Sequence, residues 1–263
     1  APAVPDADDL VAAGPDLIAT MVGALPVRGH DRTPRLHLEG GGSTPVRGTI
    51  AGRLAIRLQE RRPGPAVVAL VNAALVLLAD HEMAASTFAA RIAASARADA
   101  ASVVSAGLGP LAGALHGTAS RSVRALLADA ARTSPEAAVD RWSAGRSLVP
   151  GVGHRLYPHG DPRAAELMDR LHAAGGPPRE VRLVDEVLAV IASRDLGRPN
   201  VDMALGAMGH VWRMLPDAGE AVFAVARTVG WLAHAAEEFE RRPLRFRTRA
   251  AYVGPPPRSS AVP

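Results

Sequence analysis

Runs of alanine, leucine and valine at helical spacing constrain the fold of this chain more than any other sequence feature. Apolar residues recur every three or four positions over residues 49–60, 65–78, 84–97 and 100–106, with short breaks between the runs. Aromatic residues make up only 3% of the chain, and the runs lack the alternating β-branched residues that strands favour. The pattern predicts an all-α protein with a core of small aliphatic side chains.

The same spacing predicts helices on both sides of these runs. They are expected over residues 10–25, 118–133, 163–174, 181–193, 203–214 and 220–241. Ser134-Pro135 marks the end of one helix, and residues 148–162, which are dense in Gly, Pro, His and Arg, are expected to form a loop. Residues 27–48 read as a linker, and the tail after Gly254 is expected to be disordered.

The charge pattern narrows the classes of partner. The formal net charge is +4, and all 30 basic residues are arginine, whose planar guanidinium binds carboxylates, phosphates and nucleic acids. Basic and acidic residues are interleaved and aromatic residues are few, so we predict no nucleic-acid binding. The absence of cysteine excludes disulfides, thiolate metal sites and a cysteine nucleophile, and it fits a reducing compartment.

The sequence also predicts a cytoplasmic protein without a membrane segment. The best apolar stretch, residues 66–79, is too short for a span and contains Asn72. No signal-peptide pattern opens the chain. The start at Ala1 rather than at methionine is consistent with a processed or truncated product.

Four segments combine polar groups with Gly or Pro in a way that core packing does not need: residues 78–86, 109–120, 151–163 and 198–202. His116 follows a glycine-rich stretch and is expected to open a helix, where the dipole disfavours protonation. A neutral imidazole there can donate a hydrogen bond to a developing enolate. For this site alone, a histidine that merely caps the helix or faces solvent is the more common case.

Two further segments carry a histidine and a carboxylate. His154 lies in a loop with Arg155 and Arg163, whose guanidinium groups can bind anions, although incidental surface charge explains the segment equally well. Asp202 begins a helix after Asn200, where capping and the dipole stabilise any carboxylate. A general base needs partial desolvation and reach, and spacing alone shows neither.

Two other histidines carry little information by themselves. His81 lies between two acidic residues and reads either as a ligand or as an ordinary buried polar residue. His234, Glu237 and Glu238 share one helix face, but such groups usually form a solvated ion network, so we predict no metal site.

Taken in order, six segments resemble the motifs of the citrate synthase family. They are ADHEMAAST (79–87), similar to ADHExNAST; GALHGTAS (113–120), similar to GPLHGGAN; GVGHRLYPHGDPRA (151–164), similar to GFGHRVYKNYDPRA; RPNVD (198–202), similar to YPNVDF; AVARTVGWLAHAAEE (224–238), similar to MARTxGWxAHWxE; and RFRTRAAYVG (245–254), similar to RPRxxYxG. The resemblance covers residues 49–254. Six ordered motifs are far more specific than any one of them.

The resemblance implies a two-lobed, all-α homodimer with its active site in a cleft between a large and a small helical domain. Residues 1–117 and 214–263 would form the large domain, and residues 118–213 the small one. His116 would stabilise the enol or enolate of acetyl-CoA, while Asp202 removes the methyl proton. His154 would polarise the ketone of the oxo acid and donate a proton to it.

The resemblance also assigns the binding groups. His81, Arg163 and Arg227 map onto residues that bind the oxo acid and its carboxylates. Arg247 maps onto a further one, which reaches in from the partner subunit. The chain would condense acetyl-CoA with oxaloacetate to give citrate and CoA, as in the tricarboxylic acid cycle. The CoA thioester is a substrate, and no cofactor or metal is expected.

Departures from the family pattern keep other readings open. Family members carry a further N-terminal segment, Ala84 replaces the motif's Asn, and residues 158–160 replace its Lys-Asn-Tyr. One alternative is a 2-methylcitrate synthase that uses propionyl-CoA. Another is a non-catalytic homologue that binds an acyl-CoA or a dicarboxylate, and a longer homologue as dimer partner is a further possibility.

Overall fold

The computed structural model describes residues 5–26, 48–59, 62–113, 116–145 and 149–255. Its helices are α1 (Ala7–Ala24), α2 (Ile50–Leu58), α3 (Pro65–Leu77), α4 (Ala85–Ser95), α5 (Ala100–Leu111), α6 (Ala119–Arg132), α7 (Pro135–Ser143), α8 (Pro162–Ala173), α9 (Pro178–Ser193), α10 (Val201–Val211) and α11 (Ala218–Phe239). Extended pairing within the described ranges is limited to one bridge, between Val152 and Pro199. The all-α prediction is therefore confirmed.

Short polar side chains fix where several helices begin. The side chains of Thr49 and Asp99 accept backbone N–H bonds from the first turns of α2 and α5. Ser134 caps α7 in the same way, and Pro135 occupies its first turn, where a missing N–H costs nothing. The prediction that Ser134-Pro135 only ends a helix is thus incomplete, because this pair also starts α7.

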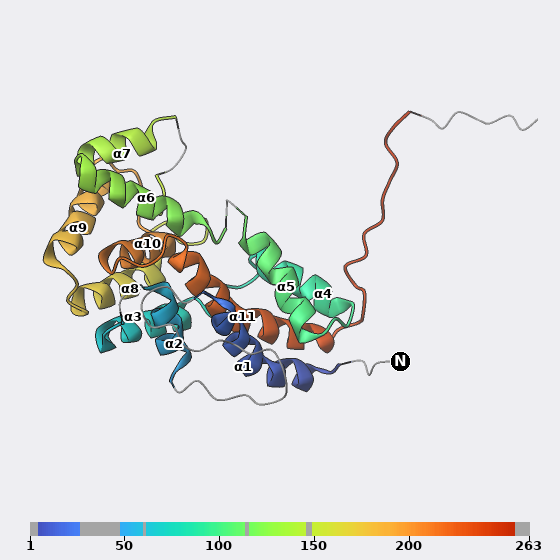
Figure 1. Ribbon diagram of the computed structural model, residues 1–263. Helices are drawn as coiled ribbons and strands as arrows, with labels where there is room; N and C mark the ends of the chain where they lie inside the picture. The colour runs from blue at the N-terminus through green and yellow to red at the C-terminus, as the bar shows by residue number, and fades with distance from the viewer. Residues whose placement is uncertain (1–4, 27–47, 60–61, 114–115, 146–148, 256–263) are drawn as a thin grey trace, which may run out of the picture.

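The long helix α11 runs through the middle of the molecule (Figure 1), and α1, α3, α4 and α5 pack against it. Helices α6, α7 and α9 form a group at the far end from α4 and α5, and α10 packs against α6, α8 and α9. The predicted division into a large and a small domain stays a prediction. Residues 27–47 and the tail from 256 onward lie outside the described residues.

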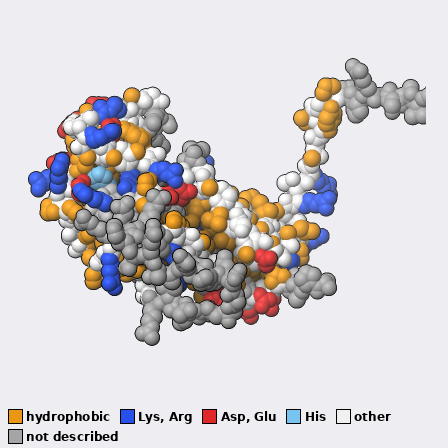
Figure 2. Space-filling model, in the orientation of Figure 1, with side chains coloured by type: hydrophobic (Ala, Val, Ile, Leu, Met, Phe, Trp, Pro, Cys, Tyr) orange, Lys and Arg blue, Asp and Glu red, His pale blue; other side chains and the backbone are white. Residues whose placement is uncertain are grey.

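The core is aliphatic, as the composition predicts. Leu70, Leu126 and Leu167 are fully or almost fully buried, and Trp231 is the largest fully buried side chain among the described residues. Acidic and arginine side chains lie interspersed over the face shown in Figure 2. In the described part of the chain, no helix combines the length and the apolarity needed to cross a membrane.

Candidate active site

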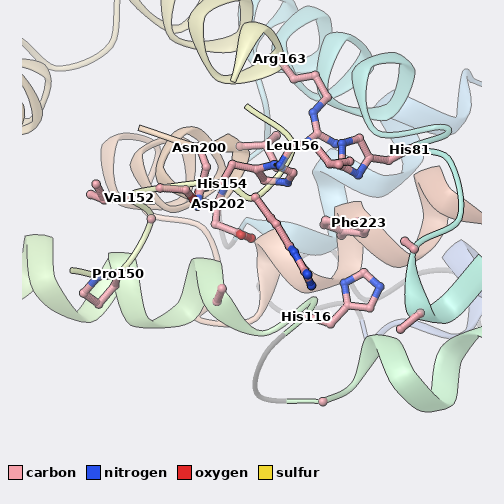
Figure 3. A pocket seen from close by; sticks show the side chains of 18 of the residues that line it. His81, His116, Pro150, Val152, His154, Leu156, Arg163, Asn200, Asp202 and Phe223 are labelled. Atoms are coloured by element: carbon pink, nitrogen blue, oxygen red, sulfur yellow. Dashed lines mark hydrogen bonds between the residues drawn. The ribbon is translucent and has the colours of Figure 1, made fainter. Parts of the chain in front are cut away.

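A cleft of about 1170 Å³ lies where the α3–α4 turn, the segment before α6, the loop before α8, α10 and α11 meet. Six predicted site residues line this cleft: His81, His116, His154, Arg163, Asp202 and Arg227. Figure 3 shows the side chains of His81, His154 and Asp202 converging from different elements. Arg247 does not join them, because it is exposed on the extended segment that leaves the body after α11 (Figure 1).

Helix α11 holds the turn that carries His81. The Gly230 backbone N–H donates to the Ala79 carbonyl at 3.0 Å, and Arg227 Nε donates to the Leu78 carbonyl at 2.9 Å. A Cβ atom at Gly230 would lie only 2.4 Å from the Ala79 oxygen, so this approach requires glycine. The turn is therefore fixed against α11 at its backbone.

His81 is an uncharged donor or acceptor at neutral pH. Burial is the main cause that lowers its pKa to about 4, and the nearby charge of Arg163 adds to the shift. Its ring meets the His154 ring edge-on, with 5.1 Å between centroids. Its Nε2 atom is buried and has no hydrogen-bond partner among the described residues. Such an atom is suited to a polar ligand.

The loop that carries His154 is joined by its backbone to the start of α10. The Asn200 N–H donates to the Gly151 carbonyl at 2.9 Å, and the Gly153 N–H donates to the Arg198 carbonyl at 2.7 Å. The Asn200 side-chain amide also donates to the Gly153 carbonyl at 2.8 Å. Gly151 has φ +76°, and a Cβ atom there would lie 2.9 Å from the Met203 Cα. The loop and the helix start form one unit.

The hydrogen bonds of His154 assign its tautomer. The Leu156 backbone N–H donates to its Nδ1 at 3.1 Å, so the proton of the neutral ring lies on Nε2. Burial, followed by the charge of Arg163, lowers its pKa and keeps the ring neutral. His154 can therefore donate one N–H bond to an oxygen in the cleft.

Asp202 is a half-buried residue whose carboxyl has no ion-pair partner among the described residues. Asn200 rather than Asp202 caps α10, since its side-chain oxygen accepts the N–H groups of Asp202 and Met203. The Oδ1 atom of Asp202 is buried and has no partner among the described residues. Burial raises its pKa to about 7, against a lowering effect of Arg163. The capping explanation for this aspartate is therefore wrong.

His116 lies in the connection before α6. Its Nε2 lies 2.8 Å from Ser86 Oγ, and its ring meets the Phe223 ring edge-on at 5.6 Å. Burial is the main cause of its lowered pKa, and the charge of Arg227 adds to it. The expected neutral imidazole is found, but the expected cause is not, because α6 begins only at Ala119.

Arg155, Arg163 and Arg227 supply positive charge to the cleft, and the last two have buried N–H groups without partners among the described residues. Arg227 is fully buried, and its Nη1 and Nη2 have no partners within the described ranges. Burial and the charge of Arg163 lower its pKa to about 10, and it remains a cation. Arg163 Nε and Nη2 bind Asp161 at 3.0 and 2.8 Å, which leaves its Nη1 without a partner there. These free N–H groups can bind carboxylates.

Sequence reasoning did not single out several residues of the site. Ser86 and Phe223 contact His116 from α4 and α11, and no local pattern could place them there. Asn200 and Asp161 each precede a helix, and that position could have marked them as N-caps. Their second contacts, to Gly153 and to Val201, are tertiary.

The His234 face of α11 carries a charge cluster. Arg91 pairs with Glu237 at 2.8 Å and with Glu238 at 2.9 Å, and His234 Nε2 lies 3.1 Å from Asp80. No group of three potential metal ligands occurs within the described residues. Glu238 is fully buried, so the prediction of a solvated network is wrong for this residue.

Comparisons with known proteins agree with this geometry. The family model for the citrate synthase C-terminal domain matches residues 11–249. Citrate synthase 2 of Bacillus subtilis is 34% identical over 210 residues, which are 78% of this chain and 56% of that protein. The 2-methylcitrate synthase 1 of Corynebacterium glutamicum is 34% identical over 188 residues, which are 68% of this chain and 48% of that protein.

The structure of citryl-CoA lyase from Hydrogenobacter thermophilus is also similar, with a TM-score of 0.68 and 27% identity. That likeness covers 80% of this chain and 86% of the lyase chain, whereas the chain spans about half the length of the two curated relatives. The family model covers most of the chain, and four motif residues, His81, His116, His154 and Asp202, line one cleft. This chain belongs to the citrate synthase family.

Proposed function

We propose that the chain condenses acetyl-CoA with oxaloacetate to give citrate and CoA. One observation carries this proposal: a carboxyl with a pKa of about 7 shares a cleft with two neutral histidines and a buried, unpaired guanidinium. A thioester methyl is a weak acid, so its deprotonation needs a base and a donor to the forming enolate oxygen together. Asp202 and His116 meet these two needs.

The proposed steps follow from the protonation states. Ionised Asp202 removes a methyl proton while His116 donates a hydrogen bond to the thioester oxygen. If the Ser86 hydroxyl donates to His116 Nε2, the ring donates through Nδ1. The enol carbon then bonds to the ketone carbon as the carbon–oxygen π bond breaks, and the ketone oxygen takes the Nε2 proton of His154. The proton that Asp202 removed from the methyl group returns to His154 through solvent, so both groups regain their starting states. Water hydrolyses the thioester and releases CoA.

The same proposal assigns the remaining groups. Arg227 and Arg163 bind the carboxylates of the oxo acid through their free N–H groups. Arg247 acts on the site of a second copy, because its own segment extends away from the body (Figure 1). The working unit is then a homodimer. Its mass in solution, compared with a chain cut before Arg247, tests this point.

A second candidate is the cleavage of citryl-CoA to acetyl-CoA and oxaloacetate. The match to the lyase over 86% of that chain favours it. Cleavage is the reverse of the condensation step, so the same base and donors serve both directions. The difference lies in whether water attacks the thioester. Citryl-CoA offered to the protein yields citrate and CoA in the first case, and acetyl-CoA and oxaloacetate in the second.

The first test is thiol release from acetyl-CoA with oxaloacetate, with propionyl-CoA in parallel. We expect release by the wild type and a loss of at least about 10²-fold in Asp202→Asn, as for removal of a general base. Faster release from propionyl-CoA would assign 2-methylcitrate synthesis. Folded wild-type protein that binds oxaloacetate but neither releases thiol nor cleaves citryl-CoA would overturn the proposal in favour of a binding role.

A further inference from the structure

Asp161 is a buried carboxylate at the edge of the cleft, and its residue is only 3% exposed. Its Oδ1 accepts the backbone N–H and Nε of Arg163, both at 3.0 Å. Its Oδ2 accepts Arg163 Nη2 at 2.8 Å and the Val201 N–H at 3.1 Å. These four bonds use the whole acceptor capacity of an ionised carboxylate. Asp161 is therefore held in one orientation, and it is not free to contact a substrate.

The bonds of Asp161 link the two sides of the site. Through Arg163 it holds the start of α8, and through Val201 it holds the residue that precedes Asp202. Asp202 has no ion partner among the described residues, although the charge of Arg163 reaches it. The charge of Arg163 thus acts on both carboxyls, and Asp161 holds the guanidinium in a bidentate pair.

We propose that Asp161 is a positioning residue that keeps Arg163 from pairing with Asp202, so that Asp202 remains a strong base. The inference rests on the proposed function and deepens it. A carboxylate paired with arginine is a weaker base than an unpaired one, and proton abstraction slows as the base weakens. Asp161 acts on Asp202 through Arg163 and does not itself react.

Arg163 and Asp161 shift the pKa of Asp202 in the directions that this arrangement predicts. Burial raises the pKa of Asp202 most, Arg163 lowers it and Asp161 raises it. Although burial opposes its ionisation, the hydrogen bonds from Arg163 keep the pKa of Asp161 itself low. The other titratable or charged groups that line the cleft are His81, Glu82, His116, His154, Arg155 and Arg227.

Two substitutions separate charge from shape. Asp161→Asn keeps the size and an N-cap oxygen for α8, but it loses the negative charge. Asp161→Glu keeps the charge on a longer side chain. The Asp161→Asn variant should lower the pKa of Asp202, because loss of the nearby negative charge favours the ionised form of this base. The acid limb of its kcat/KM profile should therefore shift to lower pH. Glu should leave this limb nearer to its wild-type position.

The direct readout is the titration of the Asp202 carboxyl by ¹³C NMR of aspartate-labelled full-length protein. The Asp202 resonance is the one lost in Asp202→Asn. Arg163→Gln should move the titration the opposite way, to higher pH. Asp129→Asn is the matched control, because Asp129 also binds an arginine, Arg141 at 3.0 Å, but lies in α6 away from the cleft. It should leave the Asp202 titration unchanged.

The outcomes are distinct. An unchanged or raised pKa of Asp202 in Asp161→Asn overturns the inference. If Asp161→Asn and Asp161→Glu lose activity equally and the acid limb of the kcat/KM profile does not move, the role of Asp161 is purely structural. This result also overturns the inference. If the Asn variant does not fold, Asp161→Ser, which also loses the charge and keeps an N-cap oxygen, decides by the same titration. A wild type that lacks condensation activity refutes the proposed function, while the NMR titration still tests Asp161.

Discussion

Two buried charge groups in this protein are built in opposite ways. On α4 and α11, Arg91 donates to Glu238 from Nε and to Glu237 from Nη1, at 3.0 and 2.8 Å. In the cleft, Arg227 is buried even more completely than Arg91, but its two terminal nitrogens have no partners among the described residues. One guanidinium is neutralised inside the fold, and the other retains its hydrogen-bonding capacity for a ligand.

The carboxyls of the two regions differ in the same way. Glu238 is fully buried, and the hydrogen bonds and charges of Arg245 and Arg91 lower its pKa. Asp202 lacks such a partner, and burial raises its pKa to about 7. The difference teaches that burial alone does not mark a functional charge. A functional charge is marked by burial without an ion-pair partner. Such burial costs free energy unless a ligand or a reaction makes use of the charge.

The largest expected effect is that of Arg227→Leu. Loss of a charge-assisted carboxylate contact costs about 4 kcal/mol, so kcat/KM for the oxo acid should fall by about 10³-fold. The free energy of unfolding should change by only about 1 kcal/mol, because relief of a buried, uncompensated charge offsets the loss of the Arg227 Nε bond to the Leu78 carbonyl. Steady-state kinetics and urea unfolding measure the two. If Arg227→Leu loses stability instead of activity, Arg227 supports the fold and does not bind the substrate.

Asp202→Asn should change how stability depends on pH. The folded-state pKa of about 7 lies above the value of 3.8 for the free group, so the folded wild type binds the extra proton between these values. Stability from this group is then lost as pH rises from about 4 to 7. As pH rises through this range, the unfolding free energy of Asp202→Asn should increase relative to that of wild type by on the order of 4 kcal/mol. We would measure the unfolding free energy of both proteins as a function of pH. If the two curves run parallel, the pKa of Asp202 is not raised.

Arg91→Met tests the ion-paired charge group on α4 and α11. It leaves Glu238 buried with Arg245 as its remaining cation, so we expect a loss of about 3 kcal/mol of stability, the low end for a broken buried pair. Activity per folded molecule should stay within about twofold, because none of these residues lines the cleft. Chemical denaturation and an assay corrected for the folded fraction are the measurements. A large activity loss at full folding would link the two regions.

The smallest expected effect is that of Arg245→Gln. Its side chain is 39% exposed, so its pair with Glu238 is screened by solvent. We expect a loss of less than about 1 kcal/mol, and less at high salt. Thermal unfolding at two salt concentrations measures it. A loss as large as that of Arg91→Met would show that exposure does not separate the two partners of Glu238.

The elements of this fold were predictable where local spacing decides them. Helix α6 was found from its apolar spacing, but α7 was missed because Ser134-Pro135 both ends one segment and begins the next. The histidines and Asp202 were found through motifs. The neutral state of His116 was predicted as well, although from the helix dipole rather than from burial. The raised pKa of Asp202, the Ser86–His116 contact and the Asp161–Val201 bond were not, because they depend on residues that are distant in sequence.

The unpaired donors of the cleft also make its occupant part of the stability of the protein. A dicarboxylate that satisfies the buried Nη atoms of Arg227 binds the folded chain and not the unfolded one. At a concentration a hundred times its dissociation constant, such an anion adds about 2.7 kcal/mol to the unfolding free energy. Citrate or phosphate in a purification buffer would therefore raise the melting temperature above that of protein prepared in chloride.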